Sequence, residues 1–138
     1  HRALTKLEPG ESWLLEPKQI GDDPCLWSPG IRTGVKRGSW FHQTECFGPV
    51  LGLMRAESLD EAMAMQNEVA YGLTAGIHSL DEREIVHWKE TVQAGNLYIN
   101  RPITGVPMMK SFVASSCALV VRPMATVSRM GPRVIAAQ

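Results

Sequence analysis

The stretch Thr44–Val50, TECFGPV, places a carboxylate, a thiol and an aromatic ring side by side just before an apolar segment. Cys46 lies near His42, and a cysteine beside a histidine is typical of a thiolate nucleophile, because the imidazole can take up the thiol proton. Glu45 suggests a second chemistry, in which its carboxylate accepts hydrogen bonds from the hydroxyl groups of a cofactor. The third interpretation is ordinary packing for Cys46 and a solvated loop position for Glu45. These residue types alone favour the third interpretation.

The composition argues against several other functions. Lys+Arg and Asp+Glu each number 14, so the chain lacks the basic field that would hold nucleic acid. Its three cysteines are odd in number and widely spaced, which argues against a disulfide framework and predicts a reducing, cytoplasmic compartment. There is no CxxC or HExxH motif and no metal-ligand spacing among the histidines, so we expect no metal site. No apolar run approaches the roughly 20 residues that span a bilayer, so we expect no transmembrane segment.

The segment 47–100 must position these residues, and it has the most regular pattern in the chain. Apolar runs predict short strands at 50–54, 73–77 and 96–100. A helical pattern separates each strand from the next, so we expect the order strand, helix, strand, helix, strand. This order is typical of an α/β fold with a parallel sheet covered by helices. Two crossovers make only a thin sheet, so we expect further strands from other parts of the chain.

Both helices have recognisable start signals. Ser58 and Glu61 have the spacing of a capping box, in which each side chain accepts a hydrogen bond from the other residue's backbone N–H. This helix is predicted to continue to a stop at Gly72. Asp81 is predicted to cap the second helix, which ends before Gly95. One stripe of the second helix is apolar and is expected to face the core: Ile85, Trp88 and Val92.

The flanking segments are less regular. Residues 1–43 are rich in turn formers with short apolar pieces between them, which predicts short strands and loops. After Gly105 we find neither a helical nor a strand period. The chain is therefore divided into residues 1–105 and a divergent tail, residues 106–138.

Three motifs occur together in this chain: E-x-F-G-P-V at 45–50, N-x-x-x-Y-G-L-T-A-G at 67–76 and G-N-x-Y-x-N-R at 95–101. In these motifs, from about Trp13 to Gly105, the chain resembles the C-terminal part of the catalytic region of the aldehyde dehydrogenases. It is most similar to the 1-pyrroline-5-carboxylate dehydrogenases of proline catabolism, which in many bacteria belong to a bifunctional protein. The resemblance implies a partial three-layer α/β domain with a mostly parallel sheet. It also implies a homo-oligomeric parent enzyme that oxidises L-glutamate γ-semialdehyde to glutamate with NAD or NADP.

The same resemblance implies site residues. Glu45 matches the glutamate that reaches the hydroxyls of the nicotinamide ribose, and Phe47 matches the phenylalanine that packs near the nicotinamide. Cys46 occupies the variable position between them and is interpreted as a packing residue. The loop that anchors the substrate carboxylate through backbone N–H groups, an anion-binding arrangement that needs a glycine, corresponds to Thr104, Gly105 and Val106. Gly105 matches this loop, whereas Val106 replaces the usual small residue and keeps its N–H. The alternative for these three residues is a plain turn after a strand.

Further along, Phe112 matches the aromatic residue that packs along the aliphatic chain of the substrate. Asn100 and Arg101 are expected to hold the carboxylate loop without touching ligand. The nucleophilic cysteine of the family belongs to an upstream motif that this chain does not contain, as do the oxyanion asparagine, the glutamate base and the nucleotide-binding fold. We therefore assign no catalytic residue and expect the isolated chain to be inactive. Two alternatives stay open: a non-catalytic assembly domain, or another semialdehyde dehydrogenase subtype.

The resemblance breaks directly after Phe112, where the family has Gly-Gly-[Trp/Phe]-Lys and this chain has Val113–Ser116. The codons GGT-GGC-TTC-AAG, which encode Gly-Gly-Phe-Lys, become GTG-GCT-TCA-AG when the first base is lost. These encode Val-Ala-Ser followed by Ser or Arg, as observed here. We therefore hypothesise a frameshift after Phe112, which the codons of the gene at these positions would test.

Overall fold

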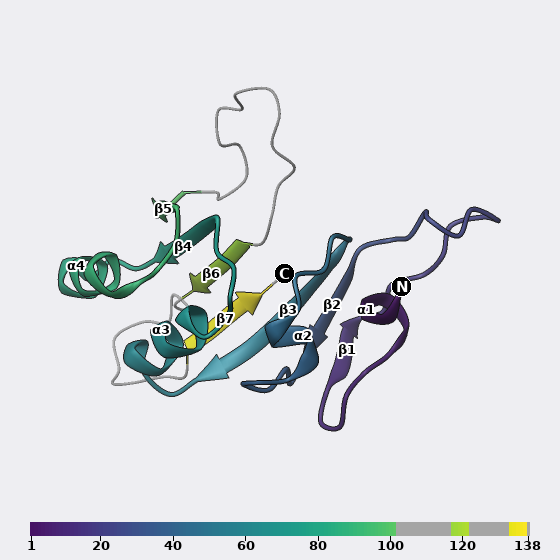
Figure 1. Ribbon diagram of the computed structural model, residues 1–138, viewed down its shortest axis with the longest axis horizontal. Coiled ribbons are helices and arrows are strands. Elements are labelled where there is room, and N and C mark those ends of the chain that lie inside the picture. The colour runs from purple at the N-terminus through teal and green to yellow at the C-terminus, as the bar shows by residue number, and fades with distance from the viewer. Residues whose placement is uncertain (102–116, 122–132, 138) are drawn as a thin grey trace.

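A computed structural model of the protein describes residues 1–101, 117–121 and 133–137 (Figure 1). In these residues one mixed sheet has the strand order β1-β2-β3-β7-β6-β4-β5. The strands are β1 (Ser12–Leu15), β2 (Gly30–Thr33), β3 (Val50–Ala56), β4 (Thr74–His78), β5 (Asn96–Ile99), β6 (Cys117–Val121) and β7 (Arg133–Ala137). The helices are α1 (Arg2–Thr5), α2 (Trp40–Gln43), α3 (Leu59–Asn67) and α4 (Glu82–Thr91). None of them is long and apolar enough to cross a membrane.

The predicted α/β class and the order strand, helix, strand, helix, strand are confirmed by β3, α3, β4, α4 and β5. The sheet differs from the expected one in its pairing. β4 pairs in parallel with β5 and β6, and β2 pairs in parallel with β3, whereas β1–β2, β3–β7 and β6–β7 are antiparallel. β3 and β4 are therefore not neighbours, because β7 and β6 lie between them.

The tail after residue 105 supplies these two strands, so the prediction that it has no strand pattern was wrong for 117–121 and 133–137. Both strands have a neighbour on each side in the sheet. Residues 117–121 and 134–137 are continuous apolar runs without alternation, and such short runs do not distinguish a strand from other buried segments. A search for an alternating pattern therefore misses them.

The start of α3 is close to the predicted capping box but not identical to it. The Ser58 hydroxyl accepts a hydrogen bond from the Glu61 N–H at 3.1 Å, as expected. The Glu61 carboxylate accepts from the N–H of Glu57 at 2.6 Å instead of that of Ser58. The helix also ends at Asn67, before the predicted stop at Gly72. Its last residue is fastened to the end of α4, because the Asn67 side chain donates to the Thr91 carbonyl and accepts from the Gln93 N–H, both at 2.9 Å.

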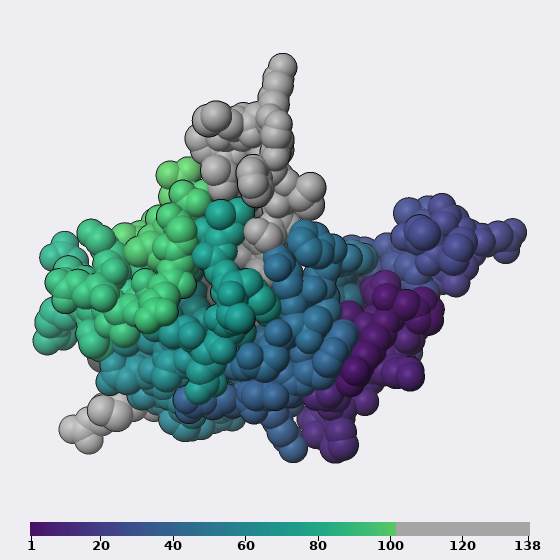
Figure 2. All heavy atoms as spheres, in the orientation of Figure 1, coloured from purple at the N-terminus to yellow at the C-terminus, as the bar shows by residue number. Residues whose placement is uncertain are grey.

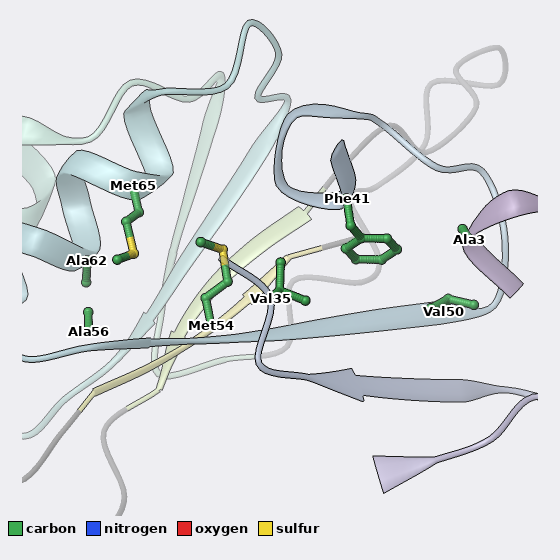
Figure 3. Close-up of a cluster of buried hydrophobic side chains, with 8 residues drawn as sticks. All are labelled: Ala3, Val35, Phe41, Val50, Met54, Ala56, Ala62 and Met65. Carbon is green, nitrogen blue, oxygen red and sulfur yellow. The ribbon is translucent and has the colours of Figure 1, made fainter. Parts of the chain in front are cut away.

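Among the described residues, two hydrophobic clusters form the core, and α3 contributes to both. Ala62 and Met65 of α3 face Met54 and Ala56 of β3 in the first cluster (Figure 3). This cluster also contains Ala3, Val35, Phe41 and Val50. The second cluster contains Leu59, Met63, Ala75, Ile77, Trp88 and Val92. The predicted apolar stripe of α4 is confirmed, since Trp88 is 0% exposed, Val92 is 9% exposed and Ile85 packs against this cluster.

The first 43 residues pack onto the β3 side of the sheet and do form short strands, β1 and β2, together with two short helices. Arg32 of β2 is buried and binds the Glu11 carboxylate at 2.9 Å. It also donates to the carbonyl oxygens of Ala3 and Lys6. A buried cation needs such partners, and they fix the N-terminal segment against the sheet. The connection between β1 and β2 extends away from the rest of the protein (Figures 1 and 2).

Candidate functional site

Glu45 and Phe47 lie in the connection between α2 and β3. Ser39 caps α2, since its hydroxyl accepts a hydrogen bond from the His42 N–H at 3.3 Å, and the helix then ends at Gln43. The other end of the connection is fixed where the Pro49 carbonyl accepts from the Gly30 N–H at 2.8 Å, at the start of β2. Short elements on both sides thus hold a loop of a few residues at the surface.

The loop exposes the two residues assigned to the cofactor to different degrees. Phe47 is 69% exposed, whereas Glu45 is half-buried. Aromatic rings contribute binding energy when a ligand covers them, and carboxylates orient hydroxyl groups. The residue types and exposure of this pair therefore fit the ribose and nicotinamide of a dinucleotide.

Cys46 and His42 do not form a nucleophile and base. The His42 ring is buried, with Nε2 donating to the Met65 carbonyl at 2.9 Å and Nδ1 accepting from the Gly38 N–H at 3.0 Å. The Cys46 thiol donates to the Thr44 carbonyl at 3.5 Å and packs against the first hydrophobic cluster. Burial raises the pKa of this thiol, so little thiolate forms near neutral pH. These contacts support the packing interpretation of Cys46.

Tyr71 is a residue of this site that the sequence reasoning did not single out. Its hydroxyl donates to the His42 carbonyl at 3.1 Å, from the turn that follows α3. Burial, with smaller contributions from the nearby Cys46 and Glu45, raises the pKa of Tyr71 to about 12. The ring is therefore close to the loop that carries Glu45. The tyrosine of the N-x-x-x-Y-G-L-T-A-G motif was the available signal.

The second predicted site, formed by Thr104, Gly105, Val106 and Phe112, lies outside the described residues. Asn100, which lies four residues before Thr104, is among the described residues. Asn100 has a left-handed backbone, with φ of 54°, and directly follows β5. Its side chain accepts from the Ser79 N–H at 3.0 Å and donates to the Ser79 carbonyl at 2.8 Å. Asn100 thus joins the end of β5 to the end of β4. The guanidinium of the next residue, Arg101, lies 5.3 Å from the centre of the Tyr98 ring.

Comparison with known proteins gives a family match over most of the chain. The family model described as "Aldehyde dehydrogenase family" matches residues 5–113. A 2,5-dioxopentanoate dehydrogenase of Saccharolobus solfataricus is 35% identical over 104 residues, which cover 75% of this chain and 19% of that protein. A 1-pyrroline-5-carboxylate dehydrogenase of Bacillus cytotoxicus is 37% identical over 87 residues, which cover 62% of this chain and 17% of that protein.

Solved structures of other proteins are also similar to this chain. Proline utilization A from Corynebacterium freiburgense is 62% identical, with a TM-score of 0.75 over 77% of this chain and 11% of its own. A 1-pyrroline-5-carboxylate dehydrogenase from Thermus with bound NAD is 34% identical, with a TM-score of 0.61 over 64% of this chain and 17% of its own. An NADP-dependent glyceraldehyde-3-phosphate dehydrogenase from Bacillus halodurans, complexed with NADP, is 28% identical, with a TM-score of 0.63 over 71% and 20%. This chain therefore spans only 11–20% of the length of these relatives.

Proposed function

Because this chain belongs to the aldehyde dehydrogenase family, we propose that it forms part of an NAD(P)-dependent enzyme that oxidises L-glutamate γ-semialdehyde, the open form of 1-pyrroline-5-carboxylate, to glutamate. The observation that carries the proposal is the 62% identity to proline utilization A from Corynebacterium freiburgense. The 1-pyrroline-5-carboxylate dehydrogenases among its relatives support the same substrate. Since the match covers a small part of each relative, the activity is that of a larger protein, which we propose to be a cytoplasmic homo-oligomer.

In that enzyme, Glu45 would hold the nicotinamide ribose and Phe47 would pack near the nicotinamide. The bound NAD or NADP supplies the hydride acceptor for aldehyde oxidation. Glu45 would accept hydrogen bonds from the two ribose hydroxyls and so fix the ring that must lie beside the substrate. The solved relatives contain NAD in one case and NADP in another. Contacts of Glu45 and Phe47 to the nicotinamide half would not distinguish the two, because NAD and NADP differ in the adenosine half.

The substrate would be held at the end of the molecule that is opposite its aldehyde group. The backbone N–H groups of Thr104, Gly105 and Val106 would bind its carboxylate, and Phe112 would pack along its aliphatic chain. The carbon at which oxidation occurs lies at the opposite end of the molecule. A fixed distance from the carboxylate loop to the reacting carbon would therefore select aldehydes of one chain length.

A second candidate substrate is 2,5-dioxopentanoate, which is favoured by the 35% identity to the Saccharolobus solfataricus enzyme. L-Glutamate γ-semialdehyde is 2-amino-5-oxopentanoate. The two compounds share a five-carbon chain, a carboxylate at one end and an aldehyde at the other, and they differ only at carbon 2. A loop that binds the carboxylate would accept both, so discrimination between them depends on contacts to the amino or keto group.

We propose that the isolated chain is inactive. Aldehyde oxidation of this kind requires a cysteine nucleophile with a base to activate it. Of the cysteines whose side chains are described, Cys25 is exposed and Cys46 is half-buried with a raised pKa. Neither has an imidazole or carboxylate hydrogen-bonded to its sulfur in the described part of the chain. We propose that residues 106–138 form a divergent tail separate from residues 1–105, with a frameshift after Phe112; the end of the family match at residue 113 supports the position of the frameshift.

A chimera tests the proposed function. Residues 5–112 of this chain would replace the matching segment of the Corynebacterium freiburgense protein, and reduction of NAD and of NADP would be measured spectrophotometrically. Three aldehydes are compared: L-glutamate γ-semialdehyde, 2,5-dioxopentanoate and the four-carbon succinate semialdehyde. We expect the highest kcat/KM with the first. A preference for succinate semialdehyde, or an inactive but folded chimera beside an active unmodified protein, would contradict the proposal.

The isolated chain is assayed in parallel at high concentration. We expect no aldehyde-dependent reduction of NAD or NADP. Activity that survives repeated purification, and that is lost in a Cys46→Ser variant, would show that this chain carries its own nucleophile.

A further inference from the structure

We infer that Tyr71 and His42 are positioning residues for Glu45: together they fix the end of α2, so that the following loop presents the Glu45 carboxylate to the cofactor. The inference rests on the proposed function, because it assumes that Glu45 binds the nicotinamide ribose. Neither Tyr71 nor His42 is expected to touch cofactor or substrate.

His42 joins α2 to the last turn of α3. Its Nε2 lies 2.9 Å from the Met65 carbonyl oxygen, which can only accept, so Nε2 must carry a proton. Its Nδ1 lies 3.0 Å from the Gly38 N–H, which can only donate, so Nδ1 must carry none. The imidazole is therefore a neutral ring with both nitrogens engaged. The ring links α2 to α3 through these hydrogen bonds, and neither of its nitrogens is available for proton transfer.

Tyr71 fixes the same helix from a different direction. The last carbonyl groups of a helix lack partners within it, and the His42 carbonyl belongs to the last turn of α2. The Tyr71 hydroxyl donates to this carbonyl at 3.1 Å. The phenol is half-buried and its pKa is raised to about 12, so it stays a neutral donor through the physiological range. Tyr71 thus caps the C-terminal end of α2 through the His42 carbonyl. His42 lies three residues before Glu45.

The loop between α2 and β3 is then fixed at both ends. At its start, His42 is held through its ring by Met65 and through its carbonyl by Tyr71. At its end, the Pro49 carbonyl is held by the Gly30 N–H at 2.8 Å and Val50 enters the sheet. Six residues, 43–48, lie between these points, so the backbone at Glu45 is restricted from both ends. A site fixed before the ligand arrives binds more tightly, because less freedom is lost on binding.

The test uses the chimera described above, with Tyr71→Phe, Glu45→Gln, the double variant and a matched control, Tyr98→Phe. Tyr71→Phe keeps the ring and removes only the donor. Tyr98 is also buried, and its hydroxyl makes no hydrogen bond to another residue of the described chain, so its variant controls for the general effect of removing a phenol. KM for NAD, KM for the aldehyde and kcat are measured for each protein. NAD binding is also titrated directly, at a temperature well below the melting temperature of every variant.

Loss of one neutral hydrogen bond that positions Glu45 is expected to raise KM for NAD about three- to tenfold. We expect less than a twofold change in KM for the aldehyde, and no effect of Tyr98→Phe. If Tyr71 acts through Glu45, its substitution changes little in the Glu45→Gln background, because neighbouring residues that act together are not additive. A purely structural role would affect both substrates alike.

The possible failures are distinguishable. If Glu45→Gln raises KM for NAD and Tyr71→Phe does not, the positioning role is refuted and the proposed function stands. The same holds if the effects of the two substitutions multiply independently. If Glu45→Gln leaves NAD binding unchanged, the assigned cofactor contact is wrong, and the inference falls with it.

Discussion

The Asn100–Ser79 contact allows a prediction that separates hydrogen bonding from backbone strain. Asn100 joins the ends of β5 and β4 through two hydrogen bonds to the backbone of Ser79, at 3.0 and 2.8 Å, and its φ is 54°. Asn100→Gly removes both bonds but tolerates the left-handed backbone. Asn100→Ala removes both bonds and also forces a Cβ into that conformation, which glycine and asparagine adopt more readily than alanine.

The magnitude follows from these contacts. Each hydrogen bond contributes about 0.5–1.5 kcal/mol, so Asn100→Gly is expected to lower the free energy of unfolding by about 1–3 kcal/mol. Ser79 is buried, which favours the upper half of this range because its N–H and carbonyl then lack partners. A left-handed backbone costs about 1 kcal/mol more for alanine, so Asn100→Ala is expected to lose about 2–4 kcal/mol.

Denaturation of the chain in urea, followed by circular dichroism, measures these differences. Asn96→Ala is the matched control: it lies at the other end of β5, and its side chain makes only a 3.5 Å contact with the Leu73 carbonyl. We expect this control to change stability by less than about 0.5 kcal/mol. Equal losses for Asn100→Gly and Asn100→Ala would refute the contribution of backbone strain. Losses no larger than that of the control would refute the contribution of the hydrogen bonds.

Three further predictions concern the core and the titrating groups. Trp88→Ala should destabilise the chain by about 3–5 kcal/mol in urea denaturation, because a fully buried indole leaves a large cavity; Val86→Ala, at a site 51% exposed, should change it little. In a Cys117→Ser background, iodoacetamide should alkylate Cys25 faster than Cys46 by peptide mass spectrometry, because burial raises the pKa of the Cys46 thiol; faster alkylation of Cys46 would contradict this. The folded-state pKa of Tyr71, about 12, lies above its ordinary value of 10.0, so the folded protein holds this proton more tightly than the unfolded chain. Its contribution to stability should therefore be complete below pH 10 and decline as the pH rises towards 12, and Tyr71→Phe should reduce the decline measured by urea denaturation across this window.

Much of the local structure follows from the sequence. The starts of α3 and α4 were predictable from Ser58 and Asp81, because a cap is a contact between residues two or three positions apart. The apolar stripe around Trp88 was predictable for the same reason, since helix periodicity is local. The family was recognisable from three short motifs, which also gave Glu45 and Phe47 as candidate cofactor contacts.

Long-range contacts decided what the sequence left open. The last residue of α3, Asn67, donates a hydrogen bond to the Thr91 carbonyl at the end of α4, a contact 24 residues away in the chain. β3 and β4 are separated because β6 and β7 from the tail insert between them, and strand pairing depends on hydrogen bonds that no local pattern encodes.

The same division applies to the candidate site. The sequence determined which residues have side chains suited to cofactor binding or nucleophilic catalysis, namely the carboxylate of Glu45, the ring of Phe47, and the neighbouring Cys46 and His42. Only the tertiary structure decided that both ring nitrogens of His42 form hydrogen bonds with backbone groups. It also decided that Tyr71, 29 residues further along, donates a hydrogen bond to the His42 carbonyl. Hydrogen bonds to backbone groups place few demands on the sequence of their partners, so they become visible only when the chain is folded.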